Sequence, residues 1–304
     1  MNIVETSGLG KRYGRTWALK DAALAIPAGY VVALVGPNGA GKTTLLHMSV
    51  GLTCPTTGQV TVLGSEPAGS PAALDQIAFV AQDAPLYKNL PVADMLHLTR
   101  NLNRRWDQQR AEARLKELSI PLDRKVGKLS GGQQAQLALT LALARRPRLL
   151  VLDEPLASLD PLARHDFMAS LMAAVAEDGL SVVLSSHVIA DLERMADYLI
   201  VLSRGQVQVA GEVEQLLAGH SMLTGPSAAA DDLAKRSAVV HARRAGTQAH
   251  LLVRGQRAAE PAPPGWEASA VGLEELVLAY LREPGAAALP GPSVRATQDC
   301  GIPA

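Results

Sequence analysis

The sequence has little cysteine, few aromatic residues, no excess of either charge and no long apolar run. Its two cysteines, Cys54 and Cys300, exclude a disulfide framework or a cysteine-based zinc site and suit a reducing compartment. Basic and acidic residues both number 29, so no overall positive field draws nucleic acid, and we expect no nucleic-acid partner. No run reaches the roughly 18 apolar residues of a membrane span, and the first residues lack the layout of a signal peptide. We therefore expect a chain that is soluble when isolated.

Three short apolar runs are each followed by polar or glycine-rich residues. The runs, which are rich in valine and leucine, occupy residues 30–35, 149–152 and 182–184. Continuous runs of this length predict strands covered on both faces, as in a parallel sheet. In open α/β sheets, ligands bind beyond the carboxyl ends of the strands. The agreement among the three segments predicts an α/β fold with a ligand site at that edge.

Helices and smaller strands are predicted around these runs. Helical patterns cover residues 43–48, part of 95–118 and 133–144, and proline follows the last two of them. Short runs at 22–26 and 60–63 predict an antiparallel accessory sheet. After residue 217 the composition changes. There we expect a linker over 219–230, a hairpin from 238–243 and 249–253, a helix over 273–281 and a disordered tail from 284 onward.

Residues 36–43 read Gly-Pro-Asn-Gly-Ala-Gly-Lys-Thr and fit the pattern G-x-x-x-x-G-K-[ST]. Glycines let backbone N–H groups wrap a polyphosphate, and the helix that follows presents its positive dipole end. Lys42 then reaches the β- and γ-phosphates, and the Thr43 hydroxyl holds Mg²⁺. An ordinary glycine-rich turn before a helix is the alternative, but it does not require all four fixed positions. The predicted nucleotide-binding residues are Gly36, Pro37, Asn38, Gly39, Ala40, Gly41, Lys42, Thr43 and Thr44.

A second glycine-rich turn, Leu129-Ser130-Gly131-Gly132-Gln133, also lies before a predicted helix. One nucleotide does not need two such anion sites from one chain, so we interpret this turn as a cap on the ATP held by another copy. The segment resembles the signature sequence of the ATP-binding-cassette (ABC) family. The resemblance extends over about residues 3–217, with the motifs in the family's order. It implies a P-loop NTPase fold with a helical signature subdomain at about 83–146.

The resemblance also implies roles for individual side chains. Asp153 would order Mg²⁺ through its water shell, and Glu154 would act as the general base on the attacking water. Gln82 resembles the glutamine that senses Mg²⁺ and the γ-phosphate. His187 resembles the switch histidine, which bonds the γ-phosphate and positions Glu154. Lys42, Gln82, Glu154 and His187 are thus the catalytic candidates, and Thr43, Gln82 and Asp153 are the Mg²⁺ candidates.

Two further nucleotide contacts follow from the resemblance. Asp160, in Ser158-Leu159-Asp160, resembles the loop that crosses the dimer interface, and Tyr13 resembles the aromatic residue that stacks on adenine. Ser130, Gly131, Gly132 and Gln133 would contact the partner's ATP. The sequence departs from the family where basic residues often follow the signature glutamine. Gln134, Ala135 and Gln136 stand there, which predicts weaker polar contacts at the interface.

The resemblance implies an ATPase subunit, with ATP and Mg²⁺ as cofactors, that drives a separately encoded transmembrane permease as one of two cassettes, identical or different. Residues 1–217 would form the ATP-binding domain, 218–283 a small α+β extension and 284–304 a disordered tail. The extension is similar to that of two-component exporters, which implies export from the cytoplasmic face of the membrane. Alternatives are a soluble cassette acting on ribosomes or DNA, and an ATP switch without turnover.

Overall fold

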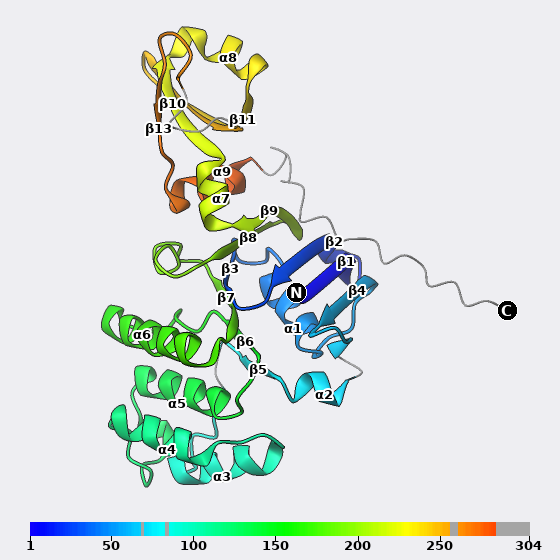
Figure 1. The fold of residues 1–304 in the computed structure, drawn as a ribbon, viewed down its shortest axis with the longest axis vertical. Helices are drawn as coiled ribbons and strands as arrows, with labels where there is room; N and C mark the ends of the chain where they lie inside the picture. Colours follow the sequence, from blue (N-terminus) through cyan, green and yellow to red (C-terminus); the bar gives the residue numbers. More distant parts are fainter. Residues whose placement is uncertain (68–69, 83–84, 256–260, 284–304) are drawn as a thin grey trace, which may run out of the picture.

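A six-stranded sheet forms the centre of the chain in the computed structural model, which describes residues 1–67, 70–82, 85–255 and 261–283 (Figure 1). Its strands are β3 (Val31–Val35), β5 (Ile77–Val80), β6 (Leu149–Asp153), β7 (Ser181–Ser186), β8 (Tyr198–Ser203) and β9 (Gln206–Glu212). They lie in the order β5-β6-β7-β3-β8-β9, and only β9 runs antiparallel to its neighbour. Every residue of β3, β6, β7 and β8 is buried. The predicted parallel core sheet is confirmed.

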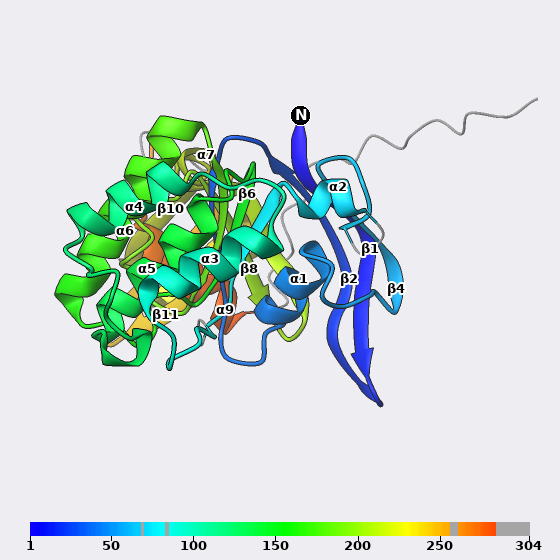
Figure 2. The same cartoon turned by 90° about the horizontal axis from the view of Figure 1, so that it is seen from below.

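A second, antiparallel sheet packs beside the first one. It contains β1 (Asn2–Tyr13), β2 (Thr16–Pro27) and β4 (Thr57–Val62) in the order β2-β1-β4. Figure 2 shows α1 (Lys42–Ser49) between this sheet and the core sheet. One apolar cluster, with Leu24, Leu34 and Leu46 among its members, joins the two sheets to α1. The helix that carries the phosphate-loop lysine is therefore held on both sides.

Helices cover the other face of the core sheet and extend from it. These are α3 (Val92–Leu102), α4 (Gln108–Glu117), α5 (Gly131–Leu143) and α6 (Pro161–Asp178), with the 3₁₀ turn η2 (Val126–Lys128). The short α2 (Pro71–Leu74) precedes β5 and lies on the side of the antiparallel sheet (Figure 2). Residues 95–118, which show a mixed helical pattern, form two helices because the chain turns over 103–107. Asp107 caps α4 by accepting a hydrogen bond from the Arg110 N–H (3.0 Å). Leu96, Leu115 and Leu137 join α3, α4 and α5 in one core.

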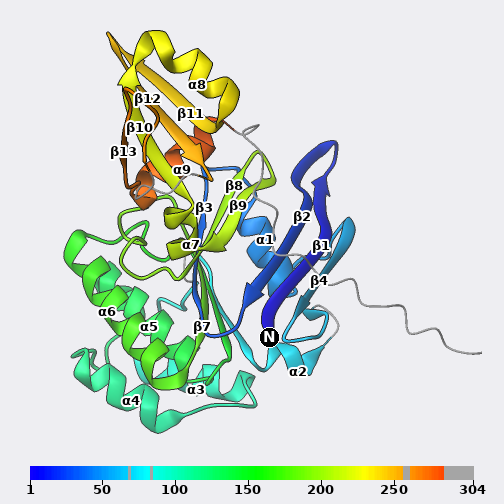
Figure 3. The ribbon, with the colours of Figure 1, turned by 45° about the horizontal axis from the view of Figure 1, so that its top comes forward.

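The residues after 217 form a four-stranded sheet with two helices, at the top of Figure 3. The strands are β10 (His220–Pro226), β11 (Ala238–Ala245), β12 (Gln248–Arg254) and β13 (Glu267–Ser269). The two helices are α8 (Ala230–Arg236) and α9 (Leu273–Arg282), with the 3₁₀ turn η3 (Ser227–Ala229), and α7 (Val213–Ala218) leads into the sheet. The predicted linker over 219–230 is wrong, because β10 pairs with both β12 and β13 and buries Leu223. The boundaries at residues 217 and 283 stay predictions, and the expected disordered tail lies outside the described residues.

A buried histidine joins this C-terminal module (residues 218–283) to its own last helix. His220 Nδ1 lies 2.6 Å from the Leu216 carbonyl oxygen, and Nε2 lies 2.9 Å from the Tyr280 hydroxyl. Burial lowers the pKa of His220, so the ring is neutral at pH 7. A neutral ring donates at one nitrogen and accepts at the other. Both contacts are thereby satisfied, and they fix α9 against α7 and β10.

Among the described helices, none combines the length and the apolar character that crossing a membrane requires.

The arginine that joins α4 to the signature helix α5 gives a stability prediction. Arg114 Nε donates to Thr140 Oγ1 (3.1 Å), and one of its terminal nitrogens donates to Gln136 Oε1 (3.3 Å). Gln136 is buried, and within the described chain its Nε2 has no hydrogen-bond partner. Arg114→Met leaves its Oε1 unpaired too, so we expect the free energy of unfolding to fall by about 1–3 kcal/mol. Urea denaturation measures the change.

Lys116→Met, on the exposed side of α4, is the control, because it adds the same side chain without removing a buried contact. An Arg114→Met variant as stable as Lys116→Met would show that the arginine contributes no net stability. Two of the residues that depart from the family pattern also form hydrogen bonds within the chain, and weaker contacts at the interface stay a prediction. Gln136 bonds within the chain, and Gln134 Nε2 donates to the Leu129 carbonyl (2.9 Å). Both departures from the family pattern therefore support the signature helix internally.

Candidate nucleotide site

The turn between β3 and α1 places backbone N–H groups at the carboxyl edge of the core sheet. Gly41 caps α1 with a φ of 104°, which L side chains rarely adopt, and a Cβ there would lie 2.4 Å from the Ala18 carbonyl oxygen. Only glycine therefore permits this entry into the helix. The first N–H groups of an α-helix have no partner within the helix. Together with the helix dipole they form an anion site, beside which Thr43 is exposed.

Lys42 points back across this turn and is almost fully buried. Its Nζ donates to the Gly36 carbonyl oxygen (2.7 Å) and lies 3.3 Å from that of Pro37. It also forms an ion pair with Glu154 Oε1 at 3.1 Å. A buried ammonium needs such partners because burial without them is costly. The phosphate loop and the end of β6 are therefore joined by one lysine.

The end of β6 is organised by a serine from the neighbouring strand. Ser185 Oγ donates to Asp153 Oδ1 (2.7 Å) and accepts from the Glu154 N–H (2.8 Å). Glu154 has a φ of 45°, which is uncommon for a residue with a side chain and carries strain at functional sites. The Ser185 contact holds this conformation. Sequence reasoning assigned Ser185 no role, and its only signal was a polar residue at the end of a buried strand.

The charge of Glu154 is set by two neighbours. Burial raises the pKa of its carboxyl. The hydrogen bonds and positive charge of Lys42 and His187 lower that pKa by more than burial raises it, so the pKa of Glu154 lies below the ordinary value. Glu154 is therefore ionised at neutral pH. A carboxylate that is ionised and held next to a phosphate site can accept a proton from water.

His187 follows β7 and contacts the same carboxylate. Its Nδ1 lies 2.9 Å from Glu154 Oε2, while about half of the side chain is exposed. Further along this segment, Asp191 lies 3.5 Å from Arg164 of α6. Lys42, Asp153, Glu154, Ser185 and His187 thus form one connected group, here called the phosphate group. Its members come from the last residues of β6 and β7, from the residues directly after these strands, and from the start of α1 after β3.

The signature turn forms a second, separate feature at the start of α5. Ser130 Oγ accepts from the Gln133 N–H (3.2 Å), and Gln133 Oε1 accepts from the Ser130 N–H (3.1 Å). This reciprocal arrangement is a capping box. Gly132 approaches α6 so closely that a Cβ would lie 2.9 Å from the Ala163 Cβ. The glycine therefore brings the start of α5 against the start of α6.

A groove of about 220 Å³ runs along these two helix starts. Ser130, Gly132, Gln133 and Asp160 line it, together with Leu118, Ile120, Gln136, Leu162, Ala163 and Asp166. Asp160 caps α6 by accepting from the Ala163 N–H (3.0 Å), and Leu162 is 71% exposed. No member of the phosphate group lines this groove. One chain therefore contains two parts of the predicted site, and the parts are separated.

Two predicted residues stand apart from both features. Gln82 follows β5 and is exposed. Tyr13 ends β1 near the turn into β2, is 53% exposed, and has the Lys11 ammonium 5.4 Å from its ring centre. Trp17 on β2 is covered in a similar way by Arg12, at 5.7 Å. The roles of Tyr13 and Gln82 stay predictions.

Comparison with known proteins agrees with this arrangement. The family model described as ABC transporter matches residues 19–157. The Fe(3+) ions import ATP-binding protein FbpC of Pseudomonas fluorescens is 36% identical over 220 residues, which cover 69% of this chain and 62% of that protein. The Nod factor export ATP-binding protein I of Rhizobium johnstonii is 34% identical over 223 residues, 70% of each chain. This chain belongs to the ABC transporter ATP-binding family.

Solved cassettes share the fold. The ATP-binding subunit of an ABC transporter has a TM-score of 0.63 and 28% identity, over 70% of this chain and 91% of that one. A dimeric bacterial ABC transporter cassette has a TM-score of 0.62 and 27% identity, over 69% and 98%. A dimeric post-hydrolysis cassette bound to ADP and Pi is 29% identical, with the same TM-score. The chain is thus an ABC cassette of an ATP-binding ATPase family, and the predicted α/β cassette fold is confirmed.

The named relatives differ in their substrates and in the direction of transport. The matched region makes up only 62% of FbpC and 63% of the sulfate/thiosulfate import ATP-binding protein CysA of Synechococcus elongatus. Two of the three named relatives are import proteins and one is an export protein. The relatives therefore include both directions of transport.

Proposed function

We propose that two cassettes pair head to tail and hydrolyse ATP in sites that each need both chains. The observation that supports this is the separation, within one chain, of the phosphate group from the groove at the signature turn. Both features end in helix N-termini, which attract anions. In a head-to-tail pair, the Ser130 turn of one cassette would face the phosphate group of the other. The partner is a second ABC ATP-binding subunit, either another copy of this chain or a different cassette.

The residues of the phosphate group fit an ATP-bound Mg²⁺. Magnesium at nucleotide sites is bound by one or two carboxylates, with phosphate oxygens and water completing the shell. Within the described residues, no cluster of three or more histidine, cysteine or acidic side chains offers an all-protein metal site. Thr43 is exposed at the start of α1, and one oxygen of buried Asp153 is held by Ser185. We propose that Thr43, Asp153 and Gln82 hold the ion, which would neutralise charge on the phosphates.

Lys42, Glu154 and His187 of the phosphate group, together with Asp160, then divide the work on ATP. Lys42 would bind the terminal phosphates in place of its present partner, Glu154. Glu154 would be released toward the attacking water and accept its proton. His187 would keep contact with Glu154 and bond the γ-phosphate, and Asp160 would cross to the partner. ATP selects the closed pair because only that state completes the contacts around the γ-phosphate.

A groove near the helical subdomain is suited to a permease. It has a volume of about 240 Å³ and is lined by Phe79, Val80, Ala81, Pro85, Leu86, Met95, Thr99, Asn103, Ala138, Leu141, Ala142 and Arg145. The lining is mostly apolar, and four of its residues, Pro85, Leu86, Met95 and Thr99, belong to the segment 85–100 of the helical subdomain. We propose that a helix of a transmembrane permease inserts here. The cassette would then work at the cytoplasmic face of the membrane.

We further propose export as the direction of transport. Support comes from the Nod factor export relative, which matches over 70% of its own length, and from the similarity to two-component exporters. A cassette acting on ribosomes or DNA is the alternative, but the chain has no basic excess. No observation here favours that reading.

Mixing two inactive variants tests the shared site. Ser130→Arg should block turnover because a bulky cation replaces the small side chain that faces the partner's ATP, while the phosphate group stays intact. Lys42→Ala should also be inactive, because it damages the phosphate group while the Ser130 turn stays intact. Each mixed dimer then holds one complete site of two, and random pairing makes half of the dimers mixed. The mixture should recover about a quarter of the wild-type turnover if the two sites act independently.

Ser130→Thr is the control, because it keeps the hydroxyl that caps α5 and should retain turnover. Phosphate release is measured at equal total protein, and thermal unfolding checks that each variant is folded. Ser130→Arg turning over ATP like the wild type would contradict the shared site. So would a wild-type rate per chain that does not change on dilution.

A further inference from the structure

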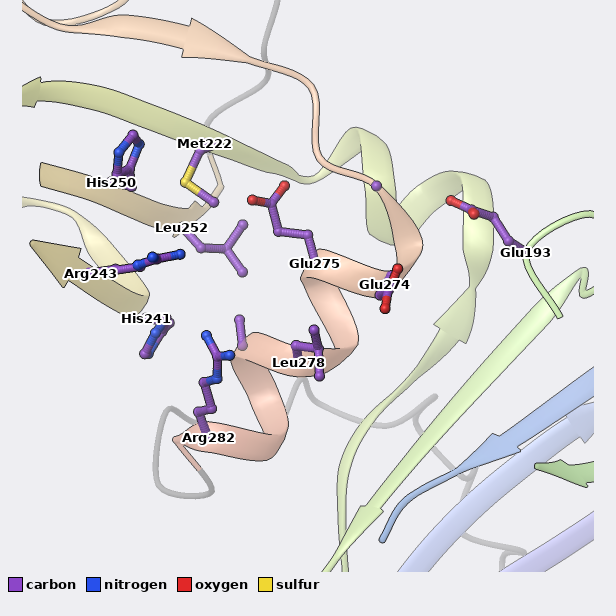
Figure 4. Close-up of a pocket in the computed structure, with 12 residues that line it drawn as sticks. Glu193, Met222, His241, Arg243, His250, Leu252, Glu274, Glu275, Leu278 and Arg282 are labelled. Atoms are coloured by element: carbon purple, nitrogen blue, oxygen red, sulfur yellow. The ribbon is translucent and has the colours of Figure 1, made fainter. Parts of the chain in front are cut away.

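The C-terminal module contains a pocket of about 630 Å³ that the cassette mechanism does not use (Figure 4). Drug-sized ligands bind in pockets of roughly 300–1,000 Å³. The lining residues are Glu193, Met222, His241, Arg243, His250, Leu252, Gly272, Glu274, Glu275, Leu278, Ala279 and Arg282. They come from β10, β11, β12 and α9, and Glu193 comes from the segment after His187. The pocket is therefore built from parts that are distant in sequence.

The pocket exists because the two faces of the module's sheet are covered differently. Leu223, Leu251 and Val253 pack against α8 on one face. On the other face Leu252 packs with Leu276 and Tyr280 of α9 in the main core. Pairing places Met222, Leu252 and His241 on one rung of that face and Thr224, His250 and Arg243 on the next. Helix α9 covers only part of these rungs, and the remainder forms the pocket.

One end of the pocket is cationic. Figure 4 shows His241 and Arg243 on β11 close to Arg282 at the end of α9. Among the described residues, neither arginine forms an ion pair or a hydrogen bond with another side chain. The Nδ1 of His241 is buried without a hydrogen-bond partner among those residues, and it lies 3.6 Å from Glu283 Oε1. The carboxylate of Glu283 thus already lies near the cationic end of the pocket, as the anionic group of a ligand would.

Apolar side chains form the middle of the pocket. Leu252 is buried, Met222 is half-buried, and Leu278 of α9 is 37% exposed. The acidic side chains lie toward the start of α9. Glu274 and Glu275 are in its first turn, where the helix dipole favours them. The pocket is therefore polarised, with cations at one end, an apolar surface in the middle and acids at the other end.

We propose that this pocket is an effector site for an amphipathic organic anion. The anionic group would bind Arg243 and Arg282, whose guanidinium groups suit carboxylates and related anions. The apolar body would lie over Met222, Leu252 and Leu278. An exposed arginine on its own is an ordinary solvated side chain. This pocket differs because two arginines surround one apolar surface together with His241, whose buried Nδ1 has no hydrogen-bond partner among the described residues. Such a combination suits a ligand with an anionic group and an apolar body.

The pocket also contacts the segment that leads to the phosphate group. A ligand bound in the pocket can therefore alter ATP turnover, an inference that rests on the proposed function. Glu193 Oε1 lies 3.4 Å from the Leu273 N–H at the start of α9. Glu193 is six residues after His187, which contacts Glu154. Between them, Asp191 pairs with Arg164 of α6. A shift of α9 is thereby passed to the segment that holds His187.

Fluorescence of 8-anilinonaphthalene-1-sulfonate, an apolar body with one anionic group, tests the site directly. The titration uses the full chain with excess ADP and Mg²⁺, so that the nucleotide site is occupied. We expect saturable binding of one probe per chain, displaced by decanoate and not by decyltrimethylammonium at equal concentration. The double variant Arg243→Gln/Arg282→Gln should bind the probe at least about tenfold more weakly, because it loses two charge-assisted contacts. Arg236→Gln, on α8 and away from the pocket, should bind like the wild type.

ATP turnover tests the effector role. Saturating decanoate should change turnover in the wild type and in Arg236→Gln, and leave the double variant unchanged. Probe binding that the double variant retains, or that Arg236→Gln loses equally, would overturn the site. Binding at the site with unchanged turnover would overturn the effector role. A wild-type chain without turnover would contradict the proposed function alone, because the probe titration does not depend on hydrolysis.

Discussion

Glu154→Gln should lower ATP turnover by about 10²–10⁴-fold while ATP binding persists, because an amide cannot accept the proton of the attacking water. The substitution keeps the shape of the side chain. It removes a carboxylate that the neighbouring Lys42 and His187 keep ionised, and with it the proposed general base. Single-turnover hydrolysis with excess protein measures the loss at the chemical step.

The same substitution should tighten ATP binding slightly and stabilise the paired state. Glu154 Oε1 lies 3.1 Å from Lys42 Nζ, so the carboxylate would compete with the phosphates for the lysine. Glutamine competes less because it has no charge. A sizing column run with ATP should therefore show a persistent dimer. Glu117→Gln, on the exposed part of α4, is the matched control. Fast turnover without a dimer in Glu154→Gln would refute the proposed role.

Lys42→Ala should weaken ATP binding by at least about 100-fold, because a nearly buried ammonium that would pair with the terminal phosphates is lost. Fluorescence titration with a labelled nucleotide measures the affinity. Lys20→Ala is the control, because it removes an exposed lysine from β2. Unchanged affinity in Lys42→Ala would contradict the phosphate-loop assignment.

A second consequence of Lys42→Ala concerns Glu154 itself. With its main counter-ion gone, the pKa of that carboxyl should rise, since burial already acts in that direction. In the wild type the lowered pKa contributes stability above the ordinary carboxyl pKa, and this contribution is lost as pH falls through the lowered value. The variant should therefore lose less stability than the wild type between neutral and acidic pH. Thermal unfolding of both proteins across that pH range measures the difference. General damage to the fold would lower the stability of the variant without making its pH dependence weaker.

The phosphate loop and the signature turn could be predicted from the sequence because the residues that each motif requires are nearly consecutive. The phosphate loop at 36–43 needs glycine at positions such as Gly41, whose positive φ excludes other residues. The signature turn follows the same logic, since Ser130 and Gln133 cap one helix over four positions. Continuous apolar runs likewise predicted β3, β6 and β7, because a strand buried on both faces cannot alternate polar residues. These features were determined by the sequence itself.

Other features depend on pairings between distant segments, which no local pattern encodes. Ser185 became a partner of Asp153 and Glu154 only because β6 and β7 lie side by side in one register. Residues 219–230 look like a linker by composition, yet residues 220–226 form β10 because β12 and β13 supply its backbone partners. The polarised pocket of the C-terminal module arises in the same way. The sequence thus determined which chemistry the chain carries, and tertiary packing decided which groups meet, because contact depends on strand register and helix placement.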